Sequence, residues 1–168
     1  MTDTPHYPTT DLSDAFCDDK NARLQYLGTD WRDFGGKTMF AGPAVTLSTF
    51  EDNTKLRAQV ETPGHGQVLV VDGFGSMNCA LFGGNLAQLA AQNGWAGVII
   101  NGCVRDTLEL KAEAVGVKAL ATHPKKSIKQ DLGDLDVPLS FGGVTINPGD
   151  WIYADEDGVV VSAKQLTL

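Results

Sequence analysis

The chain has 168 residues, of which 20% are charged and 42% hydrophobic, and its formal net charge is -8 at pH 7. This length and composition are typical of one globular domain with its own core, and they exclude a small fold that depends on disulfides. The acidic balance disfavours direct binding to DNA or RNA, because a phosphate backbone would be repelled.

The N-terminal segment MTDTPHYPTTDL lacks the basic and apolar regions of a secretory signal. No apolar run approaches the roughly 18 residues needed to cross a bilayer, so we expect a cytoplasmic protein without a membrane segment. Cys17, Cys79 and Cys103 are odd in number and widely spaced, which argues against a disulfide framework and a CxxC metal site. We interpret all three as buried thiols.

The first third of the chain predicts a helix, a strand and a second helix. Residues 9–19 have an apolar face behind a threonine cap and predict a short helix. Residues 37–50 are rich in β-branched and aromatic side chains but contain a Gly-Pro pair, which predicts a bent or interrupted strand. Residues 51–64 predict a helix capped by Asp52 or Asn53.

The middle of the chain predicts a βαβ crossover. Residues 67–73 and 97–103 are short apolar runs typical of fully buried strands, and residues 83–94 have helical spacing of leucine and alanine. The connection should be right-handed and should place the two strands parallel. A ligand site would then lie at the carboxyl ends of these strands.

The last third predicts a further helix and strand, followed by antiparallel strands. Residues 107–116 predict a helix ended by Gly116, and residues 117–123 a strand. From residue 137 to 163, apolar runs alternate with Gly-Gly, Pro-Gly and Asp-Gly turn pairs. With no repeat or linker, we predict a single domain over residues 1–168, an α/β fold in layers rather than a doubly wound sheet.

Two features fall on one rim of the predicted crossover. Gly83, Gly84, Asn85 and Leu86 begin a helix, where free backbone N–H groups and the helix dipole can hold an anion such as a carboxylate. Arg105 and Asp106 follow the neighbouring strand. The helix between them returns the chain to the same edge, so both features can face one pocket.

The side chains of the second feature suit an oxo acid and a metal. The fork of Arg105 can bind a carboxylate or keto oxygen through two hydrogen bonds. Asp106 offers the hard oxygen that Mg²⁺ and Mn²⁺ prefer. Two structural alternatives stay open: Asp106 and Glu109 match a capping pair for the next helix, and a glycine pair before a helix is more often a turn than a ligand cradle.

The remaining candidate residues give weaker support for a catalytic or metal-binding role. His65 and His123 each lack a second histidine at ligand spacing. No GxSxG, Walker or GxGxxG motif is present, which disfavours serine hydrolases, nucleotide hydrolases and dinucleotide enzymes. Lys125 and Lys126 are interpreted as part of a solvated loop. No lysine is expected inside an apolar strand, although Lys118 comes close, so a Schiff-base lysine is not predicted.

Four longer segments of the chain form a recognisable set: FGGKTMFAGPAVTLSTFEDN, VLVVDGFGSMNCALFGGNLAQLAAQNGWAGVIINGCVRD, GVKALATHP and FGGVTINPGDWIYADEDGVVVS. Together they resemble the RraA-like family, which includes regulators of ribonuclease E activity and class II 4-hydroxy-4-methyl-2-oxoglutarate aldolases. The resemblance runs from about residue 9 to 162. It implies a layered β/β/α swivelling domain with mixed sheets, assembled as a homotrimer or hexamer with sites at subunit interfaces.

The aldolase branch has a glycine, a spacer of about twenty residues, Arg-Asp, and an acidic residue three positions after that aspartate; Gly84, Arg105, Asp106 and Glu109 match it. The resemblance implies that the amides of Gly83 to Leu86 bind the pyruvyl group of a small 2-oxo acid. It also implies that Arg105 contacts substrate oxygens and that Asp106 holds a divalent cation, Mg²⁺ or Mn²⁺. The expected activities are aldol cleavage and, through the same enolate, oxaloacetate decarboxylation.

Two departures bear on this expectation. Characterised aldolases often have aspartate where this chain has Gly84, and they gain an acidic residue from a C-terminal extension that this chain lacks. The alternative function is a protein that binds and inhibits a ribonuclease E-type partner. A methyltransferase label, sometimes attached to the family, finds no support in a nucleotide-binding fingerprint.

Overall fold

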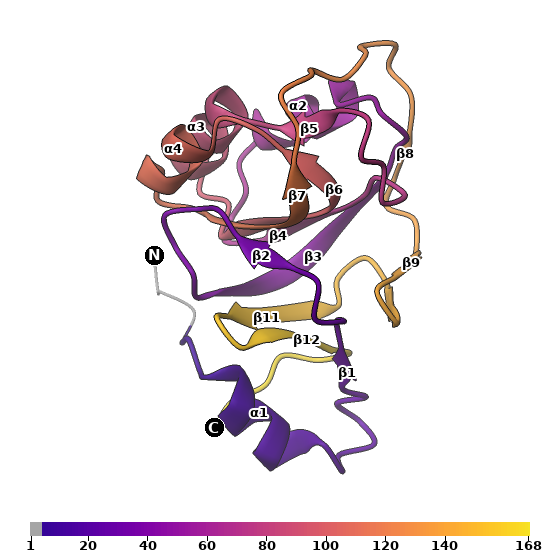
Figure 1. Cartoon of the computed structure of the whole chain (residues 1–168). Helices are drawn as coiled ribbons and strands as arrows, with labels where there is room; N and C mark the ends of the chain where they lie inside the picture. The colour runs from indigo at the N-terminus through magenta and orange to yellow at the C-terminus, as the bar shows by residue number, and fades with distance from the viewer. Residues whose placement is uncertain (1–4) are drawn as a thin grey trace.

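Strand β3 (Phe40–Ser48) joins the two halves of the molecule. In the computed structural model, which describes residues 5–168, the first part of β3 pairs antiparallel with β11 and the rest pairs parallel with β4 (Figure 1). Gly42 and Pro43 lie where the partner changes. The predicted interruption does not occur, because the strand continues through nine residues and exchanges its neighbour instead.

The upper half holds the parallel strands, with the predicted βαβ crossover at its centre. Helices α2 (Thr54–Val60), α3 (Gly84–Gln92) and α4 (Thr107–Ala112) cover one face of it (Figure 1). The other strands of this half are β2 (Arg32–Asp33), β4 (Val68–Asp72), β5 (Ala80–Phe82), β6 (Gly97–Val104), β7 (Gly116–Thr122) and β8 (Asp134–Leu135). Strands β4, β6 and β7 are parallel, which confirms the predicted crossover.

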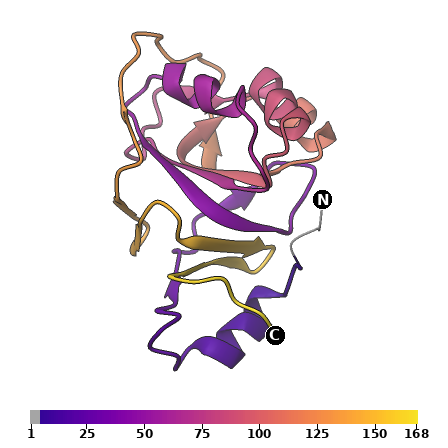
Figure 2. The ribbon, with the colours of Figure 1, turned by 180° about the vertical axis from the view of Figure 1, so that it is seen from behind.

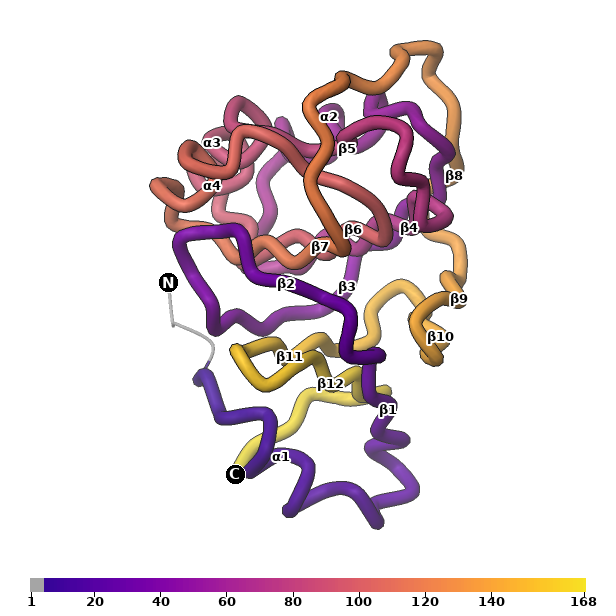
Figure 3. Tube along the Cα trace, viewed as in Figure 1, coloured from indigo at the N-terminus to yellow at the C-terminus, as the bar shows by residue number. Residues whose placement is uncertain are grey.

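The lower half is antiparallel, as predicted. Its elements are α1 (Thr9–Phe16), β1 (Gln25–Tyr26), β9 (Leu139–Phe141), β10 (Val144–Ile146), β11 (Trp151–Asp155) and β12 (Gly158–Ser162). Over the described residues the main sheet has the order β1-β12-β11-β3-β4-β6-β7-β2, with β5 beside β6 and β8 beside β3. Seen from behind, α1 lies beneath the β11–β12 hairpin, far from the other helices (Figure 2). The β9–β10 hairpin lies at one side, near β1 (Figure 3).

Strand side chains alternate between cores, which explains the uninterrupted apolar runs. In β4, Leu69 and Val71 pack in the core under the helices, whereas Val68 and Val70 pack in the core between the two halves. In β12, Val160 faces a third core against α1. A strand buried on both faces needs apolar residues at every position, not at alternate ones. The layered α/β class predicted from the sequence is confirmed.

Three details of the predicted elements are wrong. Gly116 does not end a helix; α4 ends at Ala112, and Gly116 pairs with Gly97 in the sheet, where both leave room for the ring of Phe40. Helix α1 has Pro8 at its N-cap and no side-chain cap. Cys17 is exposed, whereas the other two cysteines are buried and burial raises their pKa.

In residues 5–168, no helix has both the length and the apolar character required to cross a membrane.

Candidate active site

The site is built where two strands end side by side. Strand β5, which the sequence did not predict, leads directly into α3, and β6 leads into the turn before α4. The Arg105 backbone N–H donates to the Phe82 carbonyl at 2.9 Å and ties the two strand ends together. Gly83 and Arg105 therefore lie on one rim, as the crossover predicted.

The N-terminus of α3 lies where the cradle was predicted. Helix α3 begins at Gly84, and the first amides of a helix have no acceptor within it. Gly83 has an extended backbone, and a Cβ atom there would lie 2.6 Å from Asp106 Oδ2 and 3.2 Å from Arg105 Cγ. Glycine at position 83 thus lets Arg105 and Asp106 approach the cradle closely.

Asp106 is turned away from its own helix. Its backbone is left-handed, with φ 60° and ψ 47°, a conformation that aspartate tolerates better than most residues. The side chain makes no capping bond to α4; its Oδ2 instead accepts the Gly84 N–H at 3.0 Å. The capping pair with Glu109 is therefore wrong. Among the described residues, Oδ1 of this exposed carboxylate accepts no hydrogen bond.

Glu109 stands over Gly84. A Cβ atom at position 84 would collide with the Glu109 carboxylate and would lie 2.8 Å from Glu109 Cβ. Glu109 thus occupies the space that a side chain at position 84 would need. This contact favours glycine at position 84.

The cradle and the charged pair open on one pocket of about 250 Å³. Of the residues predicted for the site, Gly83, Asn85, Leu86, Arg105 and Asp106 line it. Gly84 is not among the lining residues, but its N–H donates to Asp106. The remaining lining residues, which sequence reasoning missed, are Asn53, Arg57, Ala80, Phe82, Lys126 and Lys129.

The missed lysines are carried by residues 123–133, which we call the strap. The strap follows β7 and arches over the upper end of the molecule toward β8 (Figure 1). Because β7 is parallel to β6, its carboxyl end lies on the same rim. The strand predicted at residues 117–123 could therefore have placed the loop that follows it beside the site. The interpretation of Lys126 as merely a solvated loop residue was incomplete, because this exposed lysine also lines the pocket.

A buried aspartate anchors the strap. Asp52 is fully buried, and its Oδ2 accepts the N–H groups of Gln130 and Leu132 at 2.6 and 3.4 Å. Its Oδ1 accepts the N–H and hydroxyl of Thr54 at 2.8 and 2.7 Å, so Asp52, not Asn53, makes the side-chain bonds at the start of α2. Burial alone would raise the pKa of Asp52, but these hydrogen bonds together hold it below its usual value.

Polar contacts fix the side chains around the pocket. Arg105 Nη1 donates to the Pro124 carbonyl at 3.3 Å. Lys129 Nζ donates to Asn53 Oδ1 at 3.2 Å, and Asn53 Nδ2 donates to the Leu81 carbonyl at 3.1 Å. Three cationic side chains, Arg57, Lys126 and Lys129, line the side of the pocket formed by α2 and the strap.

One lysine does lie inside an apolar strand, contrary to prediction. Lys118 in β7 is only 2% exposed, and its Nζ lies 3.0 Å from Asp33 Oδ1. It does not line the pocket and is engaged by a carboxylate. Lys118 therefore does not supply a free amine for Schiff-base chemistry. His65 is exposed and lies in a turn.

The residues present fit a divalent cation bound mainly by water and substrate. Among residues 5–168 there is no group of three or more His, Cys, Asp or Glu side chains that could hold a metal ion. Asp106 would be the protein ligand, with a hard oxygen not engaged by the described residues. Mg²⁺ commonly takes one or two carboxylates and completes its octahedron with water and substrate oxygens.

Comparison with known proteins matches the chain to one family over nearly its whole length. The model of the RraA-like family, described as Aldolase/RraA, matches residues 9–161. A relative from Alkalilimnicola ehrlichii, provisionally named a 4-hydroxy-4-methyl-2-oxoglutarate aldolase, is 54% identical over 95% of this chain and 96% of its own. One from Burkholderia multivorans with the same provisional name is 56% identical over 96% and 99%.

Two solved structures are similar over nearly their whole length. One, described as the RNA-processing inhibitor RraA from a Thermus species, has a TM-score of 0.91 and 45% identity, covering 97% of this chain and 96% of that one. The other, from Geobacillus kaustophilus, is described as an S-adenosylmethionine:2-dimethylmenaquinone methyltransferase. It has a TM-score of 0.91 and 49% identity, covering 95% and 97%.

Proposed function

Since the chain belongs to the RraA-like family, we propose that it is a class II aldolase that uses Mg²⁺ or Mn²⁺ to cleave 4-hydroxy-4-methyl-2-oxoglutarate into two pyruvates. The names of its relatives support this reaction. The observation that carries the proposal is the meeting of Arg105, Asp106 and the open end of α3 in one pocket.

Each group at the rim has a task in this reaction. Asp106 would hold the cation, which supplies positive charge to the keto and carboxylate oxygens of the substrate when bound. The amides at the start of α3, with the helix dipole behind them, would bind the carboxylate of the pyruvyl half. The Asp106 contact with the Gly84 N–H would keep the carboxylate and the cradle in fixed relation.

Arg105 would stabilise the charge that develops during bond cleavage. The bond between C3 and C4 breaks as the 4-hydroxyl group loses its proton to water and becomes a ketone, which gives the first pyruvate. The bonding electrons pass to the pyruvyl half, whose keto oxygen becomes negative, and a proton from water then adds to C3 to give the second pyruvate. A guanidinium fixed beside that oxygen can contribute about 3 to 4 kcal/mol, the usual loss when one such donor is removed. The Pro124 carbonyl helps to orient Arg105.

Oxaloacetate decarboxylation would be a second activity, because loss of CO₂ leaves the same enolate of pyruvate. The proposal also includes a cytoplasmic homotrimer or hexamer, as the family resemblance implies.

The proposal is tested by measuring pyruvate release from 4-hydroxy-4-methyl-2-oxoglutarate and from oxaloacetate. We expect turnover of both with Mg²⁺ or Mn²⁺, loss of turnover with EDTA, and recovery when excess metal is added. Uncatalysed oxaloacetate decay in the same metal concentration is the control. Failure to release pyruvate from either substrate, across both metals, would contradict the proposal.

Inhibition of a ribonuclease E-type enzyme is the second candidate function. It is favoured by the likeness to a structure described as an RNA-processing inhibitor and by the net charge of -8, which suits a basic RNA-binding segment. A pulldown with such a ribonuclease at low and high salt tests it. Salt-sensitive capture together with slower RNA cleavage would support inhibition, and capture without any effect on cleavage would contradict it.

A further inference from the structure

We propose that His123 is a positioning residue for Arg105, because its imidazole ring fixes the peptide group whose carbonyl holds the Arg105 guanidinium. The inference rests on the proposed function, since it explains how the group that stabilises the developing charge is kept in place. His123 does not line the pocket, so it touches no substrate and acts only through Arg105.

The backbone of His123 is tied to the strand that leads into Arg105. His123 is half-buried and is the first residue of the strap, directly after the end of β7 at Thr122. Its N–H donates to the carbonyl of Val104, the last residue of β6, at 3.0 Å. The imidazole ring therefore starts from a fixed point beside the backbone of Arg105.

One peptide group connects the His123 ring with the Arg105 side chain. His123 Nδ1 accepts the Lys125 N–H at 3.1 Å. Arg105 Nη1 donates to the Pro124 carbonyl at 3.3 Å. This carbonyl and this N–H belong to the same planar trans peptide group, so they point in opposite directions. A ring that holds the N–H at one end therefore sets the direction of the carbonyl at the other.

The rest of this turn is fixed as well. The Lys125 carbonyl accepts the N–H of Ala80, which lines the pocket, at 2.8 Å. Residues 123–125 are therefore bonded to β6 at one end and to β5 at the other. The freedom that remains is rotation of the peptide group between Pro124 and Lys125, because the proline ring fixes φ but not ψ. The bond to His123 Nδ1 restrains this rotation and keeps the carbonyl turned toward Arg105.

A purely structural role of the same bond is separated from positioning by the choice of variants. A side-chain acceptor that binds the N–H two residues further along is the pattern by which asparagine stabilises a turn. Asparagine at position 123 can therefore replace the ring as acceptor, whereas leucine and alanine cannot. Rescue by asparagine tests whether the acceptor matters, and a double variant tests whether it matters through Arg105.

The first measurement is pyruvate release from 4-hydroxy-4-methyl-2-oxoglutarate with Mg²⁺. Arg105→Met should lower kcat about 100-fold, the usual loss when such a donor is removed. His123→Leu should lower kcat about 10-fold, because Arg105 is present but no longer held in one direction. The KM should change less than about twofold, since α3 still binds the substrate carboxylate. His123→Asn should keep at least about half of the native kcat.

The double variant His123→Leu, Arg105→Met separates the two roles. We expect less than about a twofold further fall in kcat, because a residue that acts only through Arg105 has nothing to hold once Arg105 is gone. His123→Ala removes the same acceptor without adding a larger apolar side chain, and it should agree with His123→Leu. Circular dichroism would verify that each variant is folded.

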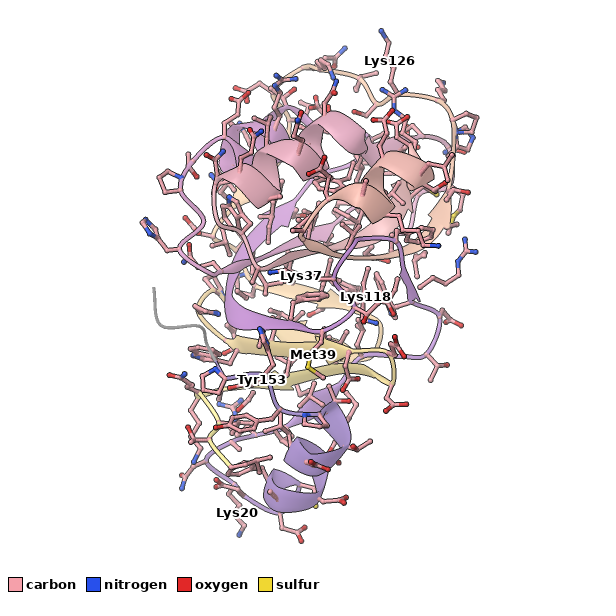
Figure 4. The ribbon with its side chains drawn as sticks, turned by 90° about the vertical axis from the view of Figure 1, so that its left-hand side faces the viewer. Lys20, Lys37, Met39, Lys118, Lys126 and Tyr153 are labelled. Carbon is pink, nitrogen blue, oxygen red and sulfur yellow. The ribbon has the colours of Figure 1, made fainter. Side chains whose placement is uncertain are left out.

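His6→Leu is the matched control, since it removes an exposed histidine far from the pocket. His6 precedes Tyr7, which packs against the core that contains Tyr153. Figure 4 shows Tyr153 in the lower half, whereas Lys126 of the strap lies at the upper end of the molecule. The kcat of His6→Leu should equal the native value.

Calorimetry with oxalate and Mg²⁺ gives a second readout that needs no turnover. Oxalate is a planar dianion that resembles the enolate of pyruvate, so its binding reports how Arg105 is held. His123→Leu should weaken oxalate binding about 10-fold when Arg105 is present. In the Arg105→Met background the same change should have less than about a twofold effect.

The inference would be overturned by full activity of His123→Leu and His123→Ala, by a further 10-fold fall in the double variant, or by a His123→Asn variant as slow as His123→Leu. Pyruvate release with unchanged oxalate affinity in His123→Leu would also overturn it and leave the proposed reaction standing. The expected oxalate pattern in a protein that releases no pyruvate would support the positioning role while refuting the proposed reaction.

Discussion

Two helices of this protein receive an aspartate at their N-terminus from a distant part of the chain, and the two aspartates are in very different states. In the lower half, Asp155 of β11 accepts the Thr9 N–H and hydroxyl of α1 at 2.7 and 2.8 Å. In the upper half, Asp106 accepts the Gly84 N–H of α3 at 3.0 Å. Both carboxylates complement the positive end of a helix dipole.

The difference lies in what else each carboxylate does. Asp155 is 7% exposed, and both of its oxygens accept hydrogen bonds, including one from Asp157 N–H at 2.9 Å. Asp106 is exposed and uses one oxygen within the described residues. A saturated, buried carboxylate stabilises the fold, whereas a partly engaged one beside a pocket retains capacity for a ligand. The unused oxygen of Asp106, and not its contact with the helix, therefore marks the candidate site.

The largest expected effect is on catalysis, through Asp106→Asn. The amide can still accept the Gly84 N–H but lacks the negative charge that would hold a cation. We expect turnover of 4-hydroxy-4-methyl-2-oxoglutarate to fall at least about 100-fold, comparable to removal of a major electrostatic group. The free energy of unfolding should change by less than about 1 kcal/mol, because the carboxylate is exposed. Steady-state kinetics and urea unfolding measure the two quantities.

Asp14→Asn is the matched control, since it removes the same charge from the exposed face of α1. Turnover in that variant should equal the native value. If Asp106→Asn kept full activity, or lost activity only because it unfolded, the distinction between the two aspartates would be wrong.

A smaller effect, on stability, is expected from Asp155→Asn. An amide retains one acceptor oxygen but turns an NH₂ group toward some of the N–H and hydroxyl donors of Thr9 and Asp157. Hydrogen bonds to a charged acceptor contribute about 1.5 to 3 kcal/mol, so we expect a loss of about 2 kcal/mol in the free energy of unfolding. Urea unfolding at pH 7 measures it.

The pH dependence of stability supplies the control for Asp155. Burial alone would raise the pKa of Asp155, but hydrogen bonds from Thr9, Asp157 and Gly158 hold it below its ordinary value of 3.8. A carboxyl with a depressed pKa in the folded state stabilises the fold fully above the unfolded pKa. This contribution is lost as the pH falls below about 4. Asp155→Asn should remove it, and an unchanged difference between pH 6 and pH 3 would contradict the assignment.

Local sequence patterns predicted the position of the site but not the direction of its side chains. The crossover and the cradle were predictable because apolar runs, helical spacing and strand ends are local patterns that place Gly83 and Arg105 on one rim. The direction of the Asp106 side chain was not, because a tertiary contact with Gly84 replaces the expected bond to its own helix. Strand β5 has only three residues and follows a turn-rich segment, too short for a periodic signal.

The strap lysines were missed for a different reason. Lys129 reaches the pocket because Asp52, far away in the sequence, binds the strap backbone at Gln130. Composition indicates only a polar lysine-rich loop there. The fold class could be predicted from the mixture of βα and β segments, but Lys126 and Lys129 reach the pocket wall through a long-range polar contact that no local pattern encodes.

The smallest expected effect concerns the cradle itself, through Gly84→Asp. A side chain at this position must displace Glu109, whose Cβ would lie 2.8 Å from the new Cβ, and it adds a third carboxylate beside Glu109 and Asp106. The favourable position of an acid at the start of α3 offsets part of that cost. We expect a loss of about 1 to 2 kcal/mol in the free energy of unfolding.

Combining Gly84→Asp with Glu109→Ala should recover most of this loss, because the second change removes the group that collides and repels. The double variant and both single variants, measured by urea unfolding, give the coupling energy, which contacting residues commonly show at about 0.5 to 3 kcal/mol. A coupling near zero would mean that the new carboxylate turns away from Glu109 at little cost. Packing would then not be the reason for glycine at position 84. The contacts around Asp106 would also constrain the start of α3 less tightly than Asp155 constrains the start of α1.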